Sequence, residues 1–168
     1  MTAAADLASA LDARGLTAAA PFEHPATGAS ATRWVDPGHL VTAAEAALAA
    51  GFFYESMTCV DRLDPHGVFE LVHTFARWDA PERLAVRTWV TRDGAAPSLS
   101  GVFPIAAWNE REAWEFYGVA FTGHPGLTWL LLPEDTAFRP LLKTFTAPPP
   151  SIYDGTLAPA AAAPEGGR

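Results

Sequence analysis

Apolar residues in the first half of the chain repeat at the spacing of a helix. They are Leu40, Ala44, Ala47 and Leu48. Asp36 and Pro37 before them are typical of an N-cap followed by the first helical position, and Gly51 after them is typical of a helix end. The pattern predicts a helix over 37–50, preceded by a short strand at Arg33–Val35.

Three strand-like segments follow, rich in β-branched and aromatic residues or alternating between two faces: Phe52–Val60, Val68–Phe75 and 83–90. In the first segment, Phe53, Glu55, Met57 and Cys59 are predicted on one side, and Tyr54, Ser56, Thr58 and Val60 on the other. Turn signals at Asp61–Gly67 and Asp79–Pro81 connect the segments. Strands with such short connections predict an antiparallel meander.

The second half of the chain predicts one more helix and then an apolar segment. Asp93–Ser100 is predicted to be a loop, and Ala106–Tyr117 a helix that ends at Gly118. The residues from Gly118 to Pro125 predict a glycine-bounded strand and turn. Leu127–Pro133 is apolar almost throughout, which favours either a central strand or an exposed patch that needs a partner.

These elements predict an α+β fold, a two-layer sandwich with helices packed on an antiparallel or mixed sheet. Residues 1–32 are predicted to be an Ala-rich segment and loop, in which Leu7 and Leu11 indicate a short, weakly anchored helix. Residues 33–146 form the predicted domain. Residues 147–168 are rich in Pro and Ala and are predicted to be an extended C-terminal tail.

Charge and cysteine content exclude several classes of function. The 168 residues hold 19 Asp and Glu against 11 Lys and Arg, a net charge of −8, which argues against binding to nucleic acid. Cys59 is the single cysteine, so the chain alone cannot build an internal disulfide or an iron–sulfur cluster. We expect Cys59 to be a small buried hydrophobe in a reducing compartment. No stretch approaches 18 apolar residues, so no direct membrane span is predicted.

The polar residues of the predicted helix 106–117 do not form a recognisable active site. Arg111 and Glu115 are four residues apart and are expected to pair on one face. Glu110 and Glu112 point about 200° apart around the helix, which argues against an acid–base couple. No two histidines have metal-ligand spacing. We therefore predict no catalytic, cofactor-binding or metal site, and the charges either form a solvated face or contact a partner protein.

The run from Glu110 to Leu127 resembles the signature of the 30-kDa subunit of respiratory complex I, which in bacteria is the C subunit of NADH-quinone oxidoreductase. The residues that carry the resemblance are Glu110, Arg111, Glu112, Glu115, Tyr117, Gly118, Phe121, Gly123, His124, Pro125 and Leu127. The segments Leu132–Asp135 and Pro140–Lys143 continue the pattern without a gap. The similarity covers roughly residues 33–146, and it implies that the signature residues contribute to contact with partner subunits.

The resemblance also implies a role without chemistry on this chain. Members of the family pack on the 49-kDa-type (D-type) subunit and lie near the B-type subunit, which holds the terminal iron–sulfur cluster. NADH, flavin, iron–sulfur clusters and quinone are then expected on partner subunits. The chain is expected to be a non-redox scaffold of the peripheral arm, on the cytoplasmic side of the cell membrane. It would support electron transfer from NADH to quinone coupled to proton translocation.

Neutral residues stand at four positions where the family commonly carries charges: Thr128, Trp129, Leu142 and Thr144. A related assembly therefore stays open as an alternative, namely a divergent second copy or the equivalent subunit of a membrane-bound energy-converting hydrogenase or formate hydrogenlyase. Two further hypotheses are a free-standing enzyme that uses Glu110, Glu112 or Glu115 as acid or base, and a binding module of an unrelated assembly. The helix geometry argues against the enzyme.

Overall fold

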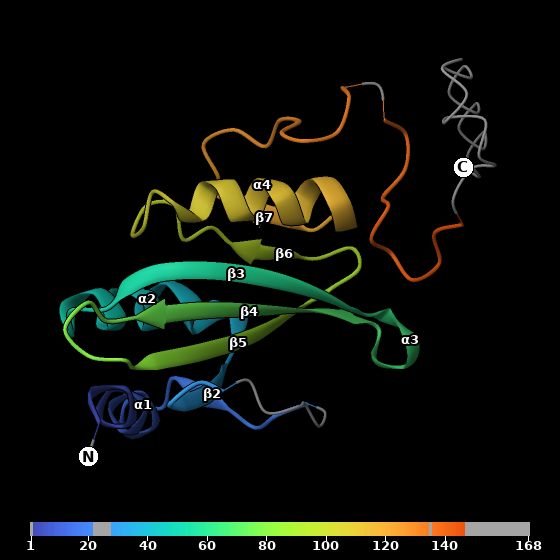
Figure 1. The fold of residues 1–168 in the computed structure, drawn as a ribbon. Helices are drawn as coiled ribbons and strands as arrows, with labels where there is room; N and C mark the ends of the chain where they lie inside the picture. The colour runs from blue at the N-terminus through green and yellow to red at the C-terminus, as the bar shows by residue number, and fades with distance from the viewer. Residues whose placement is uncertain (1, 22–27, 135, 147–168) are drawn as a thin grey trace.

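A five-stranded mixed sheet with helices packed on it forms the body of the protein (Figure 1). The computed structural model describes residues 2–21, 28–134 and 136–146. The helices are α1 (Ala3–Ala13), the 3₁₀ turn η1 (Pro37–His39), α2 (Leu40–Ala49), α3 (Leu63–His66) and α4 (Ala106–Tyr117). The large sheet contains β1 (Thr17–Ala18), β2 (Ala31–Val35), β3 (Phe53–Arg62), β4 (Val68–Ala76) and β5 (Arg83–Thr91). A small second sheet contains β6 (Ala95–Pro97) and β7 (Ala120–Thr122).

The strand order β1-β2-β5-β4-β3 confirms the predicted meander and adds a parallel pair. Strands β3, β4 and β5 are antiparallel neighbours, whereas β2 pairs with β5 in parallel. The predicted helix over 37–50 is also confirmed, with η1 as its first turn. The Asp36 carboxylate caps this turn by accepting a 2.9 Å hydrogen bond from the N–H of Gly38.

A β-bulge in β3 corrects the predicted alternation of its side chains. The pairing with β4 shifts register between Tyr54 and Ser56, so Glu55 is the extra residue. Tyr54 is therefore buried together with Met57 and Cys59, instead of lying on the opposite side. The prediction holds beyond the bulge and is wrong before it, because one inserted residue exchanges the two faces of a strand.

One hydrophobic core fills the space between the sheet and helices α1, α2 and α4. Helix α1 is anchored in this core more firmly than its composition indicates, because Leu11 is fully buried and Leu7 nearly so. An ion pair of 2.9 Å between Asp12 and Arg33 ties α1 to β2. The helix is thus part of the same folded unit as the sheet.

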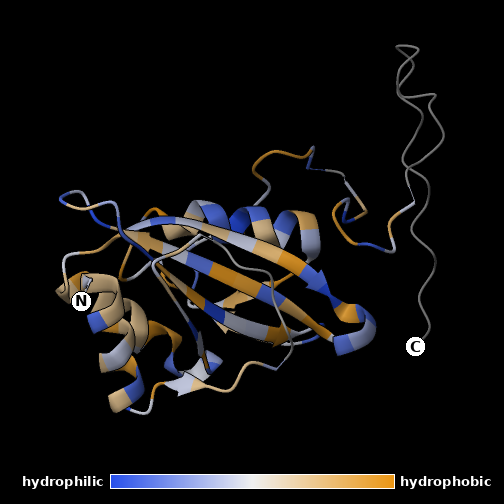
Figure 2. Cartoon of the chain, turned by 60° about the horizontal axis from the view of Figure 1, so that its bottom comes forward, coloured by the Kyte–Doolittle hydropathy of each residue, from blue (hydrophilic) through white to orange (hydrophobic). Residues whose placement is uncertain are grey.

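The other face of the sheet carries no helix in the described part of the chain (Figure 2). Charged residues on three neighbouring strands form a row there. The fully buried carboxylate of Glu70 accepts hydrogen bonds from Arg62 (3.0 Å) and from Arg87. The Arg87 guanidinium also lies over the ring of Trp34, 5.9 Å from its centroid. This row spans β3, β4 and β5 on the face opposite the described helices.

Three connecting segments differ from the prediction. The predicted loop Asp93–Ser100 contains β6, because its backbone pairs with β7, a contact between distant segments. The predicted turn Asp61–Gly67 contains α3, which ends at Gly67 with a left-handed φ of 72°. Leu127–Pro133 forms no strand, so the central-strand interpretation is wrong. The predicted C-terminal tail over 147–168 lies outside the described residues.

Candidate functional site

Side chains of helix α4 bind the backbone of the apolar segment that follows the helix. This segment has no regular secondary structure. We call residues 124–132 the strap. The side chain of Glu115 is fully buried and accepts hydrogen bonds from three consecutive backbone N–H groups of the strap. They belong to Leu130, Leu131 and Leu132, with distances of 3.0 Å for the first two. Three aligned N–H donors around one carboxylate form a small anion nest, which fixes the backbone without regular secondary structure.

Arg111 binds the preceding part of the strap. Its Nε donates to the carbonyl of Thr128 (3.0 Å), and its Nη2 donates to the carbonyl of Trp129 (2.6 Å). The predicted pair between Arg111 and Glu115 is therefore wrong. Both side chains point to the strap, where the arginine meets carbonyl groups and the carboxylate meets N–H groups.

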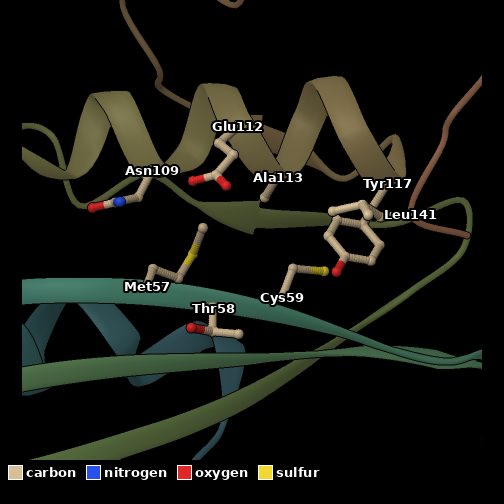
Figure 3. A pocket seen from close by; sticks show the side chains of 8 residues that line it. All are labelled: Met57, Thr58, Cys59, Asn109, Glu112, Ala113, Tyr117 and Leu141. Carbon is tan, nitrogen blue, oxygen red and sulfur yellow. The ribbon is translucent and has the colours of Figure 1, made fainter. Parts of the chain in front are cut away.

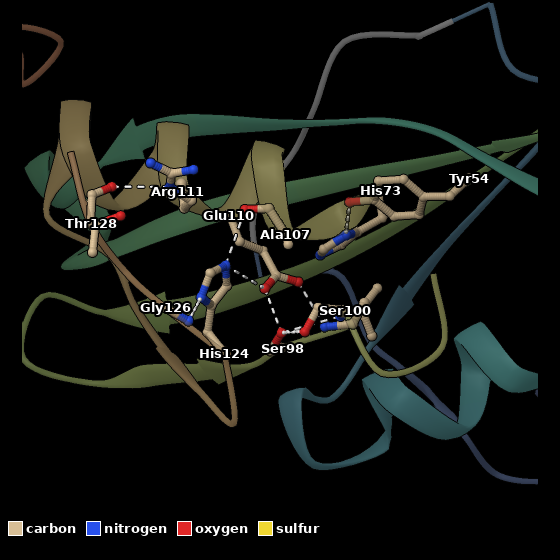
Figure 4. A network of polar contacts seen from close by, with 11 residues as sticks. Tyr54, His73, Ser98, Ser100, Ala107, Glu110, Arg111, His124, Gly126 and Thr128 are labelled. Carbon is tan, nitrogen blue, oxygen red and sulfur yellow. Dashed lines mark hydrogen bonds and ion pairs between the residues drawn. The ribbon is translucent and has the colours of Figure 1, made fainter. Parts of the chain in front are cut away.

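Glu110 binds a different segment, the turn before α4 (Figure 4). Its buried carboxylate accepts hydrogen bonds from the hydroxyl of Ser98 (2.5 Å) and the N–H of Leu99 (2.7 Å). Burial raises the pKa of Glu110, while these two hydrogen bonds and the nearby His124 oppose the shift. Glu110 thus joins α4 to the loop that enters it.

His124 fixes the start of the strap beside Glu110 (Figure 4). Its Nδ1 accepts a 2.9 Å hydrogen bond from the N–H of Gly126, so Nε2 carries the proton in the neutral ring. Nε2 then donates to the carbonyl of Ala107 at 3.0 Å, and it lies 4.0 Å from the Glu110 carboxylate. Both ring nitrogens are used inside the chain, which leaves no free nitrogen for a ligand.

Arg139 joins α4 to Trp129 of the strap, a role for which no sequence motif provides a signal. Its Nη1 donates to the backbone carbonyl of Glu115 at 2.9 Å. The guanidinium lies over the rings of Trp114 and Trp129, 5.0 and 5.3 Å from their centroids. Burial lowers the pKa of Arg139, and the Glu115 carboxylate opposes this shift. Residues so distant in sequence leave no local sequence pattern from which their contact could be predicted.

The remaining signature residues support α4 or turn the chain. Gly118 ends the helix with a φ of 87°, a left-handed conformation that favours glycine, and Gly123 has a φ of 81°. Phe121 is buried in β7, and Tyr117 packs edge-on against Phe69. Leu127 is half-buried against the core. Pro125 and Glu112 are exposed.

Large apolar side chains are exposed at the N-cap of α4, on α4 itself, on the strap and on the residues that follow. They are Ile105, Trp108, Leu131, Phe138 and Leu141. Leu131 is 65% exposed even though its own N–H is bound by Glu115. Buried polar side chains thus hold apolar side chains at the surface, an arrangement typical of a protein-binding surface.

The same site offers little for catalysis. Glu110 and Glu115 are fully buried and accept hydrogen bonds from their own chain, while Glu112 is exposed on another side of α4. Cys59 is buried, and burial with Asp61 and Glu70 nearby raises the pKa of its thiol. Within the described ranges, no three His, Cys, Asp or Glu side chains gather closely enough to hold a metal ion. No described helix has the length and apolar character needed to cross a membrane.

Comparison with known proteins assigns the fold and signature to a family. A family model described as the 30-kDa subunit of respiratory-chain NADH dehydrogenase matches residues 33–151. The chain belongs to this family. The match covers α4 and the whole strap, so Glu110, Arg111 and Glu115 act within the family's shared domain.

Two relatives are named as the C subunit of NADH-quinone oxidoreductase. The protein from Salinispora arenicola is 39% identical over 80 residues, which are 48% of this chain and 31% of the relative. The protein from Roseiflexus sp. is 36% identical over 92 residues, 54% of this chain and 53% of the relative. A third, from Aquifex aeolicus, carries the double designation C/D and is 34% identical over 55% of this chain and 16% of its own length. The chain thus spans about half or less of these curated relatives.

A solved structure shares the fold. It is titled as the membrane-bound sulfane sulfur reductase, an archaeal respiratory membrane complex. A chain of that complex is 20% identical, with a TM-score of 0.68 over 89% of this chain and 87% of the other. The likeness confirms the predicted α+β architecture of this family member.

Proposed function

We propose that this chain is a non-redox scaffold subunit of the peripheral arm of an NADH-quinone oxidoreductase. In this role it supports electron transfer from NADH to quinone, coupled to proton translocation, by holding redox subunits together. The observation that carries the proposal is the strap, whose backbone is fixed by Glu115 while Leu131 is left 65% exposed. Fixing an apolar side chain outward gives no benefit to an isolated chain, whereas it prepares a surface for a partner.

A D-type subunit is the partner that we propose for this surface. The C/D names of relatives from Aquifex aeolicus and Chromohalobacter salexigens support it, because they point to C-type and D-type segments within one chain. Segments that share a chain have a high effective concentration and often form a stable contact. The B-type subunit, with the terminal iron–sulfur cluster, is the second proposed neighbour.

The chemistry of the complex then belongs to other subunits. We place NADH, flavin, the iron–sulfur clusters and quinone on partner chains, and this chain on the cytoplasmic side of the membrane as a peripheral component. The hydrogen bonds of Glu110, Glu115 and His124 support this division, because each side chain binds backbone groups of its own chain.

A matched pair of surface variants tests the proposal. Leu131→Ser removes an exposed leucine of the strap, and Leu48→Ser removes one of similar exposure (50%) on α2. Each variant is co-expressed with the proposed D-type and B-type partners and the other redox subunits of the complex, and the yield of the purified complex and its quinone reduction are measured. We expect Leu131→Ser to lower the yield about tenfold and Leu48→Ser to leave it unchanged, with equal melting temperatures of the two free chains.

Two results would contradict the proposal. One is full assembly and activity of the complex when the chain is omitted. The other is the same yield for Leu131→Ser as for the unaltered chain. Recovery of a nickel-containing subunit in place of an NADH-oxidising one would assign the chain to the hydrogenase-type alternative.

A further inference from the structure

The two edges of the large sheet are built differently. One edge is the two-residue strand β1, and very short edge strands are a common protection against unwanted pairing. The other edge is β3, ten residues long, which pairs with β4 and with no other described strand. Alternate residues of β3 therefore direct their N–H and C=O groups away from the sheet.

The centre of β3 carries none of the residue types that usually protect an edge. Residues 56–60 read Ser-Met-Thr-Cys-Val, without a charged residue, proline or glycine. The bulge at Glu55 lies before this stretch, and regular pairing with β4 continues from Ser56 to Arg62. A regular row of outward backbone groups, unpaired by any described strand, is complementary to one kind of occupant, namely another strand.

A hollow beside this edge would receive side chains of such a strand (Figure 3). It lies between β3 and α4 and has a volume of about 90 Å³, enough for several waters or one small side chain. Met57 and Cys59 point into it from β3. Ala113 and Tyr117 face it from α4. In an added strand, every second side chain would point toward this hollow.

One charged side chain, that of Glu112, lines the hollow. Glu112 lines it with an exposed carboxylate, and none of its eight lining residues is Lys or Arg. Burial raises the pKa of Tyr117, and Cys59, Glu112 and Asp61 add to the shift. A negative charge next to apolar walls favours an incoming basic side chain flanked by small apolar ones.

We propose that the outer edge of β3, unpaired by any described strand, binds an extended segment of a partner protein, which adds a strand to the sheet and places a Lys or Arg beside Glu112. The proposal deepens the scaffold function and rests on it, since the partner is a subunit of the same complex. It adds a second contact that is separate from the strap, because the hollow lies on the β3 side of α4.

Hydrogen exchange of backbone amides, compared between the free full-length chain and the purified complex, tests the added strand. We expect the outward amides within 56–60 to exchange at least about tenfold more slowly in the complex. Amides of Leu71 and Val72 in the central strand β4 serve as the control and should change little. The charge is tested with Glu112→Lys, which should weaken assembly about tenfold, against Glu112→Gln, which should weaken it less.

The outcomes separate this proposal from the scaffold function. A complex that forms while amides 56–60 exchange as in the free chain overturns the added strand and leaves the scaffold function intact. Equal assembly of Glu112→Lys and the unaltered chain overturns the basic contact. A free chain that is dimeric, with the same amides already protected, assigns the edge to a second copy and overturns the partner strand. Failure of any complex to form removes the scaffold function, and this proposal with it.

Discussion

The carboxylate of Glu115 lies 3.0 Å from the backbone nitrogen of Leu131, and a buried charge thereby holds an exposed leucine in place. The two residues act together although one is charged and buried and the other is apolar and exposed. Glu115 has no exposure and Leu131 is 65% exposed. The signature glutamate acts on the surface indirectly, through the backbone of the strap.

Glu115→Gln should detach the strap from α4. An amide presents one acceptor and two donors, so its N–H groups would face backbone N–H groups that now donate to a carboxylate. We expect a loss of about 1–3 kcal/mol in the free energy of unfolding. We also expect faster hydrogen exchange at Leu130–Leu132. Denaturant unfolding checks the first and exchange the second.

Glu112→Gln is the matched control on the same helix, because Glu112 is exposed. Its effect on the free energy of unfolding should stay within about 0.5 kcal/mol. Equal destabilisation by the two variants would show that the helix charge matters and that the bonds to the strap do not.

Arg111→Ala should weaken assembly by loosening the strap. The variant removes two hydrogen bonds to the carbonyls of Thr128 and Trp129, and a lost bond to a charged group costs about 1.5–3 kcal/mol. Arg111→Lys should restore only part of this, because an ammonium group cannot hold two carbonyls as a planar guanidinium does. Yield of the complex and melting temperature of the free chain are the measurements. A fall in yield with an unchanged melting temperature would instead favour a direct contact of Arg111 with a partner.

The sequence predicted those parts of the fold that depend on local spacing. Helix α4 has the predicted bounds and ends at Gly118, where the chain needs a left-handed residue. The meander was predicted because short turns allow only antiparallel neighbours. The bulge at Glu55 was missed, since nothing in the alternation of Phe53–Val60 marks one residue as the extra one.

The polar partners within the candidate site could not be predicted. Spacing alone placed Arg111 beside Glu115, at the distance of one helical turn. In the structure each finds stronger partners on the strap, whose course is set by tertiary packing. Arg139 lies 24 residues from Glu115, and that contact depends on the same packing. The family signature located Arg111 and Glu115, without indicating that their side chains bind the strap, and it did not include Arg139.

Acid should destabilise the fold through His73. The ring is fully buried, its Nδ1 lies 3.0 Å from the Tyr54 hydroxyl, and burial lowers its pKa from 6.5 to about 3. Between these two values the unfolded chain binds a proton that the folded chain excludes, so stability falls as the pH falls. The slope from this one group approaches about 1.4 kcal/mol per pH unit.

The double variant Tyr54→Phe/His73→Leu should lose this slope. It removes both polar partners together, so neither is left buried without the other. Denaturant unfolding between pH 7.5 and 4 compares the two proteins, with pH 7.5 as the internal reference. A slope that stays the same in the variant would assign the acid sensitivity to other groups.

The ion pair between Glu70 and Arg87 should be strongly coupled. Their side chains are 0% and 4% exposed, so each depends on the other for compensation of its charge. Glu70→Leu leaves the Arg87 guanidinium without its carboxylate and should cost about 3–5 kcal/mol in the free energy of unfolding.

The double variant Glu70→Leu/Arg87→Met replaces the pair by apolar side chains and should recover much of that loss, because no charge remains uncompensated at this position. Denaturant unfolding of Glu70→Leu, Arg87→Met and the double variant gives the coupling energy between the two side chains. Additive losses would mean that solvent or another group already compensates Arg87. Arg62, the other partner of Glu70, should contribute less to the loss. Its side chain is 25% exposed, so its charge can remain hydrated when Glu70 is removed.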